Sequence, residues 1–212
     1  MAVTTQGNVV IADAQQSIVF VVSLAASEPK ILCRCGSDGT EPGQFQQHTL
    51  RSVTCGSGGQ IITADANRLQ VFCSSTGRFL RTLAPTLTKG QWGGVTYDGQ
   101  GFLLASYVET AKIKSATGSA GSKCGVWVIR MSTGVPLFHF EANSAKLKRP
   151  GRLCTVVVSQ ESTAADCSHA KEAEGPELPV NGREPIEPEA HLAAYMYVCD
   201  VADDCLKRYR YL

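Results

Sequence analysis

The sequence lacks the long apolar run that a membrane-spanning helix requires. Its most apolar stretch, residues 18–26, is much shorter than the ~18 apolar residues that cross a bilayer. Asp13 precedes this stretch and no Lys or Arg does, whereas a signal peptide begins with basic residues. The stretch therefore predicts a buried strand, and we expect no membrane partner.

An excess of charge of one sign is also missing. The chain has 20 Lys and Arg residues against 19 Asp and Glu residues, a formal net charge of +1, which by itself favours neither a nucleic-acid binder nor an acidic tail. The charges are, however, unevenly distributed along the sequence. Residues 160–190 hold eight acidic and two basic residues, a charge of −6, so the remaining residues together carry +7.

Paired cysteines and metal-ligand motifs are absent. The nine cysteines form no C-x-x-C pair, and an odd number in a 212-residue chain does not suit a disulfide framework. The nearest approaches to zinc-ligand spacing are Cys33 with Cys35 and Cys167 with His169, too few for a structural site. The sequence predicts reduced thiols in a cytoplasmic protein, most of them small core residues, and no metal.

Catalytic motifs are lacking as well. The sequence contains no G-x-S-x-G, H-E-x-x-H or P-loop pattern, and its four histidines share no motif. Asp13, Asp65 and Asp200 recur at equivalent places, which indicates Asx-type turn hydrogen bonds rather than a metal or acid–base site. We therefore predict no catalytic residue and no cofactor in this chain.

What the sequence does contain is an internal repeat of four units. Each unit has a short β-favouring segment followed by two apolar segments, separated by Gly, Asp and Ser, and the first three units add a fourth segment. No segment shows sustained 3.6-residue apolar spacing, so the whole chain is predicted to be all-β. The second segments of the units are residues 7–13 (GNVVIAD), 59–65 (GQIITAD), 101–106 (GFLLAS) and 195–200 (YMYVCD).

Units of about 45 residues with four short strands are typical of the blades of a β-propeller. A β-sandwich is the alternative, because it also has short strands at regular spacing. A sandwich does not, however, require the same Gly-to-Asp cassette in every unit. We therefore predict a single propeller domain whose units are residues 1–46, 47–92, 93–148 and 149–212.

The repeat resembles the NHL repeat. The second unit carries this resemblance most specifically, in residues 59–65, 67–72 (NRLQVF) and 77–81 (GRFLR). The connectors 43–45 (GQF) and 90–92 (GQW) resemble the blade junction of the same family. Among NHL proteins, the chain is most similar to the tripartite motif (TRIM-NHL) family, in the group of tripartite motif-containing proteins 2 and 3 and brain tumor protein.

The resemblance implies a six-bladed propeller, of which these units correspond to the last four. An open arc leaves an unpaired sheet edge, which missing blades, another chain or closure into a smaller ring is expected to cover. The last unit stops after its third segment, so its blade is expected to lack the outer strand. Two insertions depart from the family pattern: residues 109–123, and the acidic, Pro-rich residues 160–190, for which we predict disorder.

The resemblance also implies a non-catalytic recognition module that binds protein substrates or cargo in the context of ubiquitin ligation and proteasomal turnover. The RING and B-box domains of that ubiquitin-protein ligase family need clustered Cys and His ligands, and this sequence has no such cluster. A third alternative is an enzyme similar to the peptidyl amidating lyases, but no convincing set of metal ligands supports it.

The resemblance implies a second functional hypothesis, a post-transcriptional regulator that binds single-stranded RNA through basic and aromatic side chains on one propeller face. Two of the candidate residues have a competing structural interpretation: Arg68 as a solvated blade residue and Trp92 as part of the core between blades. The residues matched to the binding face are Arg51, Arg68, Trp92, Lys148, Arg149 and Arg152.

Overall fold

The computed structural model of the chain is built almost entirely of β-strands. Apart from one short 3₁₀ turn, Ser57–Gly59, every regular element among the described residues is a strand, so the all-β prediction is confirmed. In this part of the chain, no helix is long and apolar enough to pass through a bilayer. The structure describes residues 1–83, 90–109, 123–141, 150–159, 192–200 and 205–210, with side chains for residues 1–83, 90–108 and 124–140.

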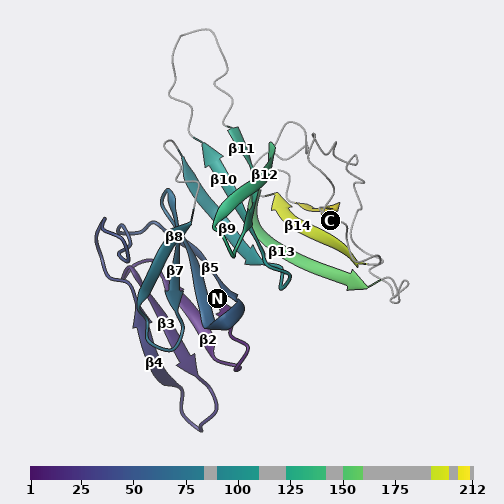
Figure 1. The fold of residues 1–212 in the computed structure, drawn as a ribbon. Helices are drawn as coiled ribbons and strands as arrows, with labels where there is room; N and C mark the ends of the chain where they lie inside the picture. The colour runs from purple at the N-terminus through teal and green to yellow at the C-terminus, as the bar shows by residue number, and fades with distance from the viewer. Residues whose placement is uncertain (84–89, 110–122, 142–149, 160–191, 201–204, 211–212) are drawn as a thin grey trace, which may run out of the picture.

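The strands form four antiparallel sheets (Figure 1). The first three sheets have four strands each, and the described residues of the fourth form three. Within every sheet the strands pair in sequence order. The strands are β1 (Ala2–Val3), β2 (Val9–Asp13), β3 (Ile18–Ser23) and β4 (Lys30–Cys35); β5 (Leu50–Gly56), β6 (Gln60–Asp65), β7 (Arg68–Cys73) and β8 (Phe79–Leu83); β9 (Gln91–Tyr97), β10 (Phe102–Glu109), β11 (Lys123–Arg130) and β12 (Val135–Glu141); and β13 (Pro150–Ser159), β14 (Leu192–Asp200) and β15 (Cys205–Arg210).

Each sheet corresponds to one of the segment groups expected from the sequence. The recurring segments 7–13 and 59–65, for example, contain β2 and β6, the second strands of their sheets. Val, Ile and Phe favour strands, and the Gly and Asp residues between them favour turns, so local sequence was sufficient to predict these strands. Residues 110–122 and 160–191, which cover most of the two predicted insertions, lie outside the described residues.

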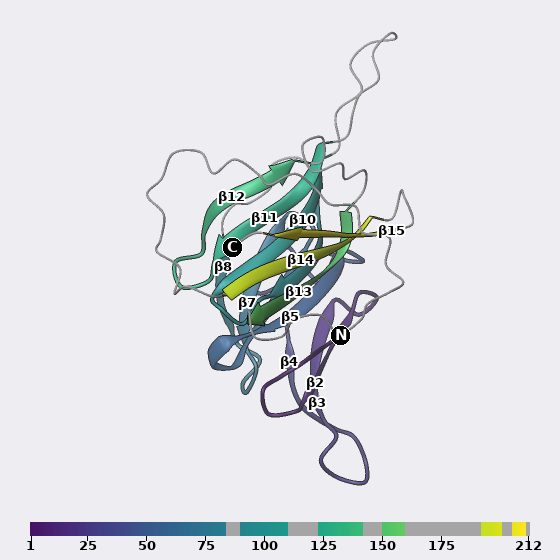
Figure 2. The same ribbon diagram turned by 90° about the vertical axis from the view of Figure 1, so that its right-hand side faces the viewer.

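Neighbouring sheets pack against one another mainly through their first strands. β1 and β2 contact β5, β5 and β6 contact β9, and β9 and β10 contact β13. The sheets therefore follow one another in a row, with the first sheet (purple) and the fourth (yellow-green) at its two ends in Figure 1. In the view of Figure 2 the fourth sheet lies nearest the viewer and the first lies below the others.

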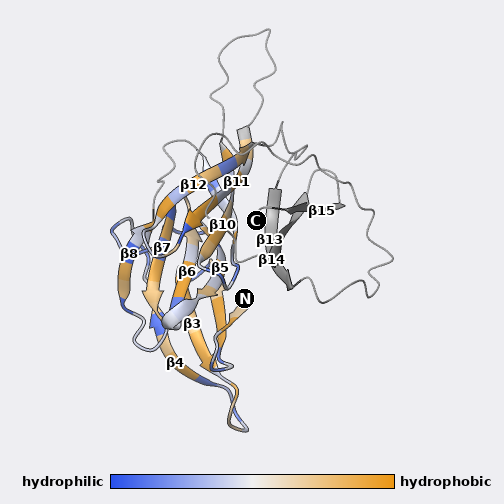
Figure 3. Cartoon of the chain, turned by 45° about the vertical axis from the view of Figure 1, so that its right-hand side comes forward, coloured by the Kyte–Doolittle hydropathy of each residue, from blue (hydrophilic) through white to orange (hydrophobic). Residues whose placement is uncertain are grey.

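The second sheet is buried on both faces because it lies between the first and the third. Side chains alternate between the two faces of a strand. In β6, Ile61 accordingly enters the core shared with the first sheet and Ile62 the core shared with the third; in β7, Phe72 and Val71 divide in the same way. Figure 3 shows the apolar residues, in orange, along the strands of these sheets.

A close backbone contact also joins the outer part of the first sheet to the second. Gly77 lies in the turn between β7 and β8 with a φ of +72°, and a Cβ added to it would lie 2.0 Å from the carbonyl oxygen of Arg34 in β4. Glycine has no Cβ and adopts a positive φ without strain, so it satisfies both requirements. The two sheets therefore touch near their outer strands as well as through β2 and β5.

We expect Gly77→Ala to lower the free energy of unfolding by about 2–5 kcal/mol, because the new methyl group adds overpacking to the cost of a left-handed backbone. Gly99→Ala is the matched control: Gly99 has a φ of +81° but no atom within 4 Å of its added Cβ. It should cost only about 1–2 kcal/mol. Urea unfolding of both variants measures the difference, and equal losses would contradict the contact with Arg34.

Candidate functional site

The predicted binding residues Arg51, Arg68 and Trp92 lie where the inner strands of the second and third sheets begin, an end of the molecule that we call the entry face. Arg51 is near the start of β5, Arg68 opens β7 after a tight turn, and Trp92 is near the start of β9. The backbone N–H of Trp92 donates to the carbonyl oxygen of Ala66 at 2.8 Å. This bond joins the turn between β6 and β7 to the start of the third sheet.

Arg51 is an exposed residue of the entry face. Its Nη2 donates to Oε1 of Gln91 at 3.0 Å, which links β5 to β9. Among the described residues no carboxylate pairs with Arg51. Because a guanidinium has five N–H donors, the others are free to bind an external acceptor such as a phosphate or a carboxylate.

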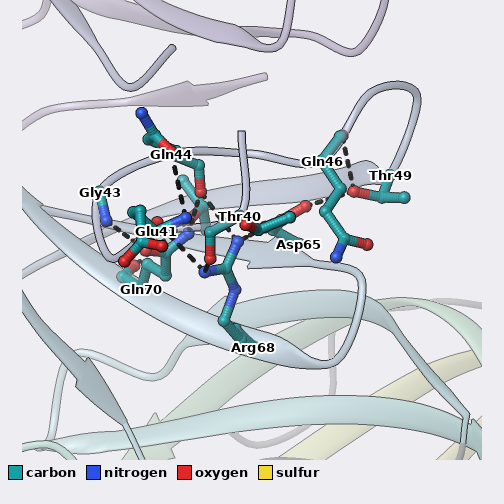
Figure 4. Close-up of polar contacts among 10 residues, drawn as sticks. Thr40, Glu41, Gly43, Gln44, Gln46, Thr49, Asp65, Arg68 and Gln70 are labelled. Atoms are coloured by element: carbon teal, nitrogen blue, oxygen red, sulfur yellow. Dashed lines mark hydrogen bonds and ion pairs between the residues drawn. The ribbon is translucent and has the colours of Figure 1, made fainter. Parts of the chain in front are cut away.

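Arg68, by contrast, is bound from several sides within the protein (Figure 4). Its Nη1 donates to the carbonyl oxygens of Thr40 at 2.6 Å and Glu41 at 3.2 Å. Its Nη2 donates to the carbonyl oxygen of Gln44 at 3.0 Å and to the carboxylate of Asp65 at 2.8 Å. The side chain is 14% exposed. Arg68 therefore fastens the connector between the first two sheets, which differs from the solvated or ligand-binding roles considered from the sequence.

Asp65 completes this buried polar cluster. Its side chain is 0% exposed, and it accepts hydrogen bonds from the hydroxyl of Thr49 and from Arg68. The predicted Asx turn is correct for Asp13, which accepts from the backbone N–H of Gln15 at 2.9 Å. It is wrong for Asp65, because the partners of Asp65 are side chains, one of them in the preceding connector. The side chain of Asp200 lies outside the described residues.

The connector Gly43–Gln44–Phe45 is anchored by both polar and aromatic contacts. Oε1 of the buried Gln70 accepts from the Gly43 N–H at 2.8 Å, and its Nε2 donates to the Gln44 carbonyl oxygen at 2.9 Å. The fully buried Phe45 ring lies 5.4 Å from the ring of Phe72. The sequence indicated this connector only by family resemblance, and its polar partners were missed because Gln70 and Asp65 belong to no recognisable binding motif.

Trp92 belongs to the core between the second and third sheets. It is 1% exposed and its ring lies 6.4 Å from the ring of Tyr107 in an edge-to-face arrangement. Among the described residues its Nε1–H has no acceptor. Since the indole is covered on both faces by protein, this residue takes the core position rather than presenting a ring on which a base would stack.

The side chains of the other three predicted binding residues lie outside the described part of the chain. Lys148 and Arg149 lie outside the described residues. Arg152 lies on β13, whose side chains are also outside the described part of the chain. Of the six matched residues, only Arg51 therefore has a described side chain that is exposed.

A depression of about 470 Å³, which we call the seam pocket, lies at the opposite ends of the second and third sheets. It is formed where turns follow β5, β9 and β11, and Arg81 of β8 crosses it: the Nη2 of Arg81 donates to the carbonyl oxygen of Met131 at 2.5 Å. The apolar lining residues are Phe102 and Met131. The polar side chains that line it belong to Ser57, Gln60, Arg81, Gln100, Arg130 and Ser132.

The chemistry of the seam pocket suits an anionic group. The guanidinium of Arg130 lies 5.9 Å from the centre of the Phe102 ring, a cation–π contact that orients it. Among the described residues, neither Arg130 nor Arg81 has a carboxylate partner. Arg81 already donates to the carbonyl oxygens of Met131 and Ser132, so Arg130 is the main group for an anion, and the remaining N–H donors of Arg81 and the nearby amide and hydroxyl groups would add to it. Sequence reasoning missed this pocket because its residues come from separate turns that share no motif.

We expect Asp65→Ala to lower the free energy of unfolding by about 3 kcal/mol, because it leaves the largely buried guanidinium of Arg68 without its counter-charge. Asp13→Ala is the control, since it removes a half-buried carboxylate that caps a turn, and should cost about 0.5–1.5 kcal/mol. Chemical denaturation of both variants gives the comparison. Losses of similar size would show that the Asp65–Arg68 pair does not secure the connector.

Comparisons with known proteins give little further information. No family model matches the sequence, and no curated protein matches it. A chain of hydrazine synthase from Kuenenia stuttgartiensis matches among the solved structures, at 16% sequence identity and a TM-score of 0.44. The match covers 99% of this chain and 53% of that one, so this chain spans about half the length of the matched structure.

Proposed function

We propose that the chain is a partial β-propeller of the NHL type and acts as a non-catalytic recognition module for a protein partner. The row of four sheets, each with its strands paired in sequence order and packed on the next through its first strand, supports the propeller proposal. The resemblance to TRIM-NHL proteins supplies the context, which is recognition of a substrate or cargo for ubiquitin ligation and proteasomal turnover. The partner is expected in the cytoplasm.

The observation that carries this proposal is the seam pocket. Arg81 and Arg130 would bind an acidic side chain or the C-terminal carboxylate of a peptide, and Phe102 and Met131 would contact an apolar neighbour of that group. Binding sites of this kind combine apolar lining with a few polar groups that fix orientation. The described residues of the pocket supply both.

Single-stranded RNA at the entry face is the second candidate, and the exposed guanidinium of Arg51 favours it. Binding of single strands usually combines phosphate contacts with aromatic stacking. Here the ring of Trp92 is buried and the guanidinium of Arg68 is bound to the protein. These placements weaken the RNA hypothesis relative to protein recognition.

We expect the chain to bind peptides with a free, acidic C-terminus, selected from a synthetic random library, and Arg130→Ala to weaken binding about tenfold or more. The factor follows from the ~1.5–3 kcal/mol of a charged hydrogen bond. Arg78→Ala, which removes an exposed arginine from the turn before β8, should leave affinity unchanged. Fluorescence anisotropy with the selected peptide and its amidated form measures both effects.

A randomised single-stranded RNA pool serves as the competing probe. RNA binding that falls steeply with salt and disappears in Arg51→Ala, together with no peptide binding, would replace protein recognition by the RNA hypothesis. If the Arg130→Ala variant binds the peptide as strongly as the unchanged chain, the peptide binds outside the seam pocket.

A further inference from the structure

Three cysteines lie on strands β4 and β7, near the outer contact of the first sheet with the second. Cys33 and Cys35 lie on β4, and Cys73 is the last residue of β7. All three are free thiols. Cys33 and Cys73 are half-buried, and Cys35 is buried.

A hydrogen bond places the sulfur of Cys33 at the turn that follows Cys73. The Sγ–H of Cys33 donates to the carbonyl oxygen of Ser74, the residue that follows Cys73, at 3.1 Å. The carbonyl of Arg34 packs directly against Gly77 in the same turn. Strand β4 and the turn after β7 are therefore in contact, and Cys33 lies against the chain next to Cys73.

The three thiols differ in their expected reactivity. Hydrogen bonds from the side chains and then the backbone N–H groups of Ser75 and Thr76 lower the pKa of Cys73 to about 6. The Sγ of Cys73 lies 3.2 Å from the Ser75 hydroxyl. Burial raises the pKa of Cys33, and burial with the neighbouring thiols raises that of Cys35 to about 12. Because the thiolate is the nucleophile, Cys73 is the reactive member at neutral pH.

We propose that Cys73 and Cys33 form a redox-responsive pair, in which Cys73 attacks a hydroperoxide and Cys33 resolves the product as a disulfide between the first and second sheets. Cys73 suits the first role because it is partly exposed and lies in a polar turn. Cys33 suits the second because its sulfur already points at that turn. Cys35 is fully buried and is not reached by the oxidant.

The reaction balances in two steps. The Cys73 thiolate attacks one oxygen of the hydroperoxide, the O–O bond breaks, and with one added proton the products are the Cys73 sulfenic acid and an alcohol, or water if the oxidant is hydrogen peroxide. The Cys33 sulfur then attacks the sulfenic sulfur and the S–O bond breaks. The hydroxyl leaves with the Cys33 proton as water, and the S–S bond remains.

The disulfide would restrict the movement of the first sheet relative to the second. It closes residues 33–73 into a loop, which reduces the conformational entropy of the unfolded chain. It also ties β4 to the turn between β7 and β8, beside the existing contact of Arg34 with Gly77. Oxidation would thereby stabilise the packing of the first sheet on the second, and reduction would release it.

The test treats the full chain with stoichiometric hydrogen peroxide at neutral pH, blocks the remaining thiols and maps disulfides by mass spectrometry. We expect Cys33–Cys73 as the main disulfide and a rise in melting temperature of about 5–10 °C over the reduced chain. The rate of Cys73 alkylation by iodoacetamide should be half-maximal near pH 6 and fall below that pH as the thiolate is protonated.

Matched variants distinguish this pair from general thiol oxidation. Cys35→Ser should keep the rise in melting temperature, whereas Cys33→Ser should lose it and leave a sulfenic acid on Cys73 that dimedone traps. Ser75→Ala, which removes a hydroxyl rather than a thiol, should move the midpoint of Cys73 alkylation to higher pH. A disulfide between Cys33 and Cys35, or alkylation of Cys73 no faster than that of Cys55, whose pKa burial raises to about 11, would overturn the proposal.

Discussion

The contact between the first two sheets depends on the buried ion pair of Asp65 and Arg68. A buried carboxylate is costly unless it is paired and hydrogen-bonded, and Asp65 satisfies this requirement with Arg68 and the hydroxyl of Thr49. The same guanidinium binds the carbonyl oxygens of Thr40 and Gln44, so the charge pair, together with Gln70, holds the connector in place. Phe45 is thereby placed against Phe72, and the apolar core between the sheets closes around it.

The same packing determines which polar and aromatic side chains are available to a ligand. At the entry face, two of the side chains predicted to contact a nucleic acid are unavailable, because Trp92 is buried and Arg68 is hydrogen-bonded within the protein. At the opposite end, Arg130 stacks on Phe102 without a carboxylate partner among the described residues. Among the described residues, each end therefore keeps an arginine without a carboxylate partner, Arg51 at the entry face and Arg130 in the seam pocket, and the seam pocket adds the remaining donors of Arg81.

The outer contact of the first two sheets has different chemistry from their core. Apolar side chains fill the core, whereas the turn after β7 surrounds Cys73 with hydroxyl and N–H donors that stabilise its thiolate. Because Gly77 permits the carbonyl of Arg34 to approach, this polar turn reaches the strand that carries Cys33. A packing requirement for glycine and the proximity of two thiols thus have the same structural origin.

The sequence by itself determined the strands, their grouping and the all-β class, because strand formation and turns follow local alternation of apolar residues with Gly and Asp. Arg51, Arg68 and Trp92 were singled out as candidate binding residues only through the family resemblance. Only the tertiary structure decided which of these side chains is available, because Arg68 donates to carbonyl oxygens of the preceding connector and the ring of Trp92 is packed in the core between the second and third sheets. The seam pocket and the cysteine pair were likewise decided by packing, since each combines residues from segments distant in sequence.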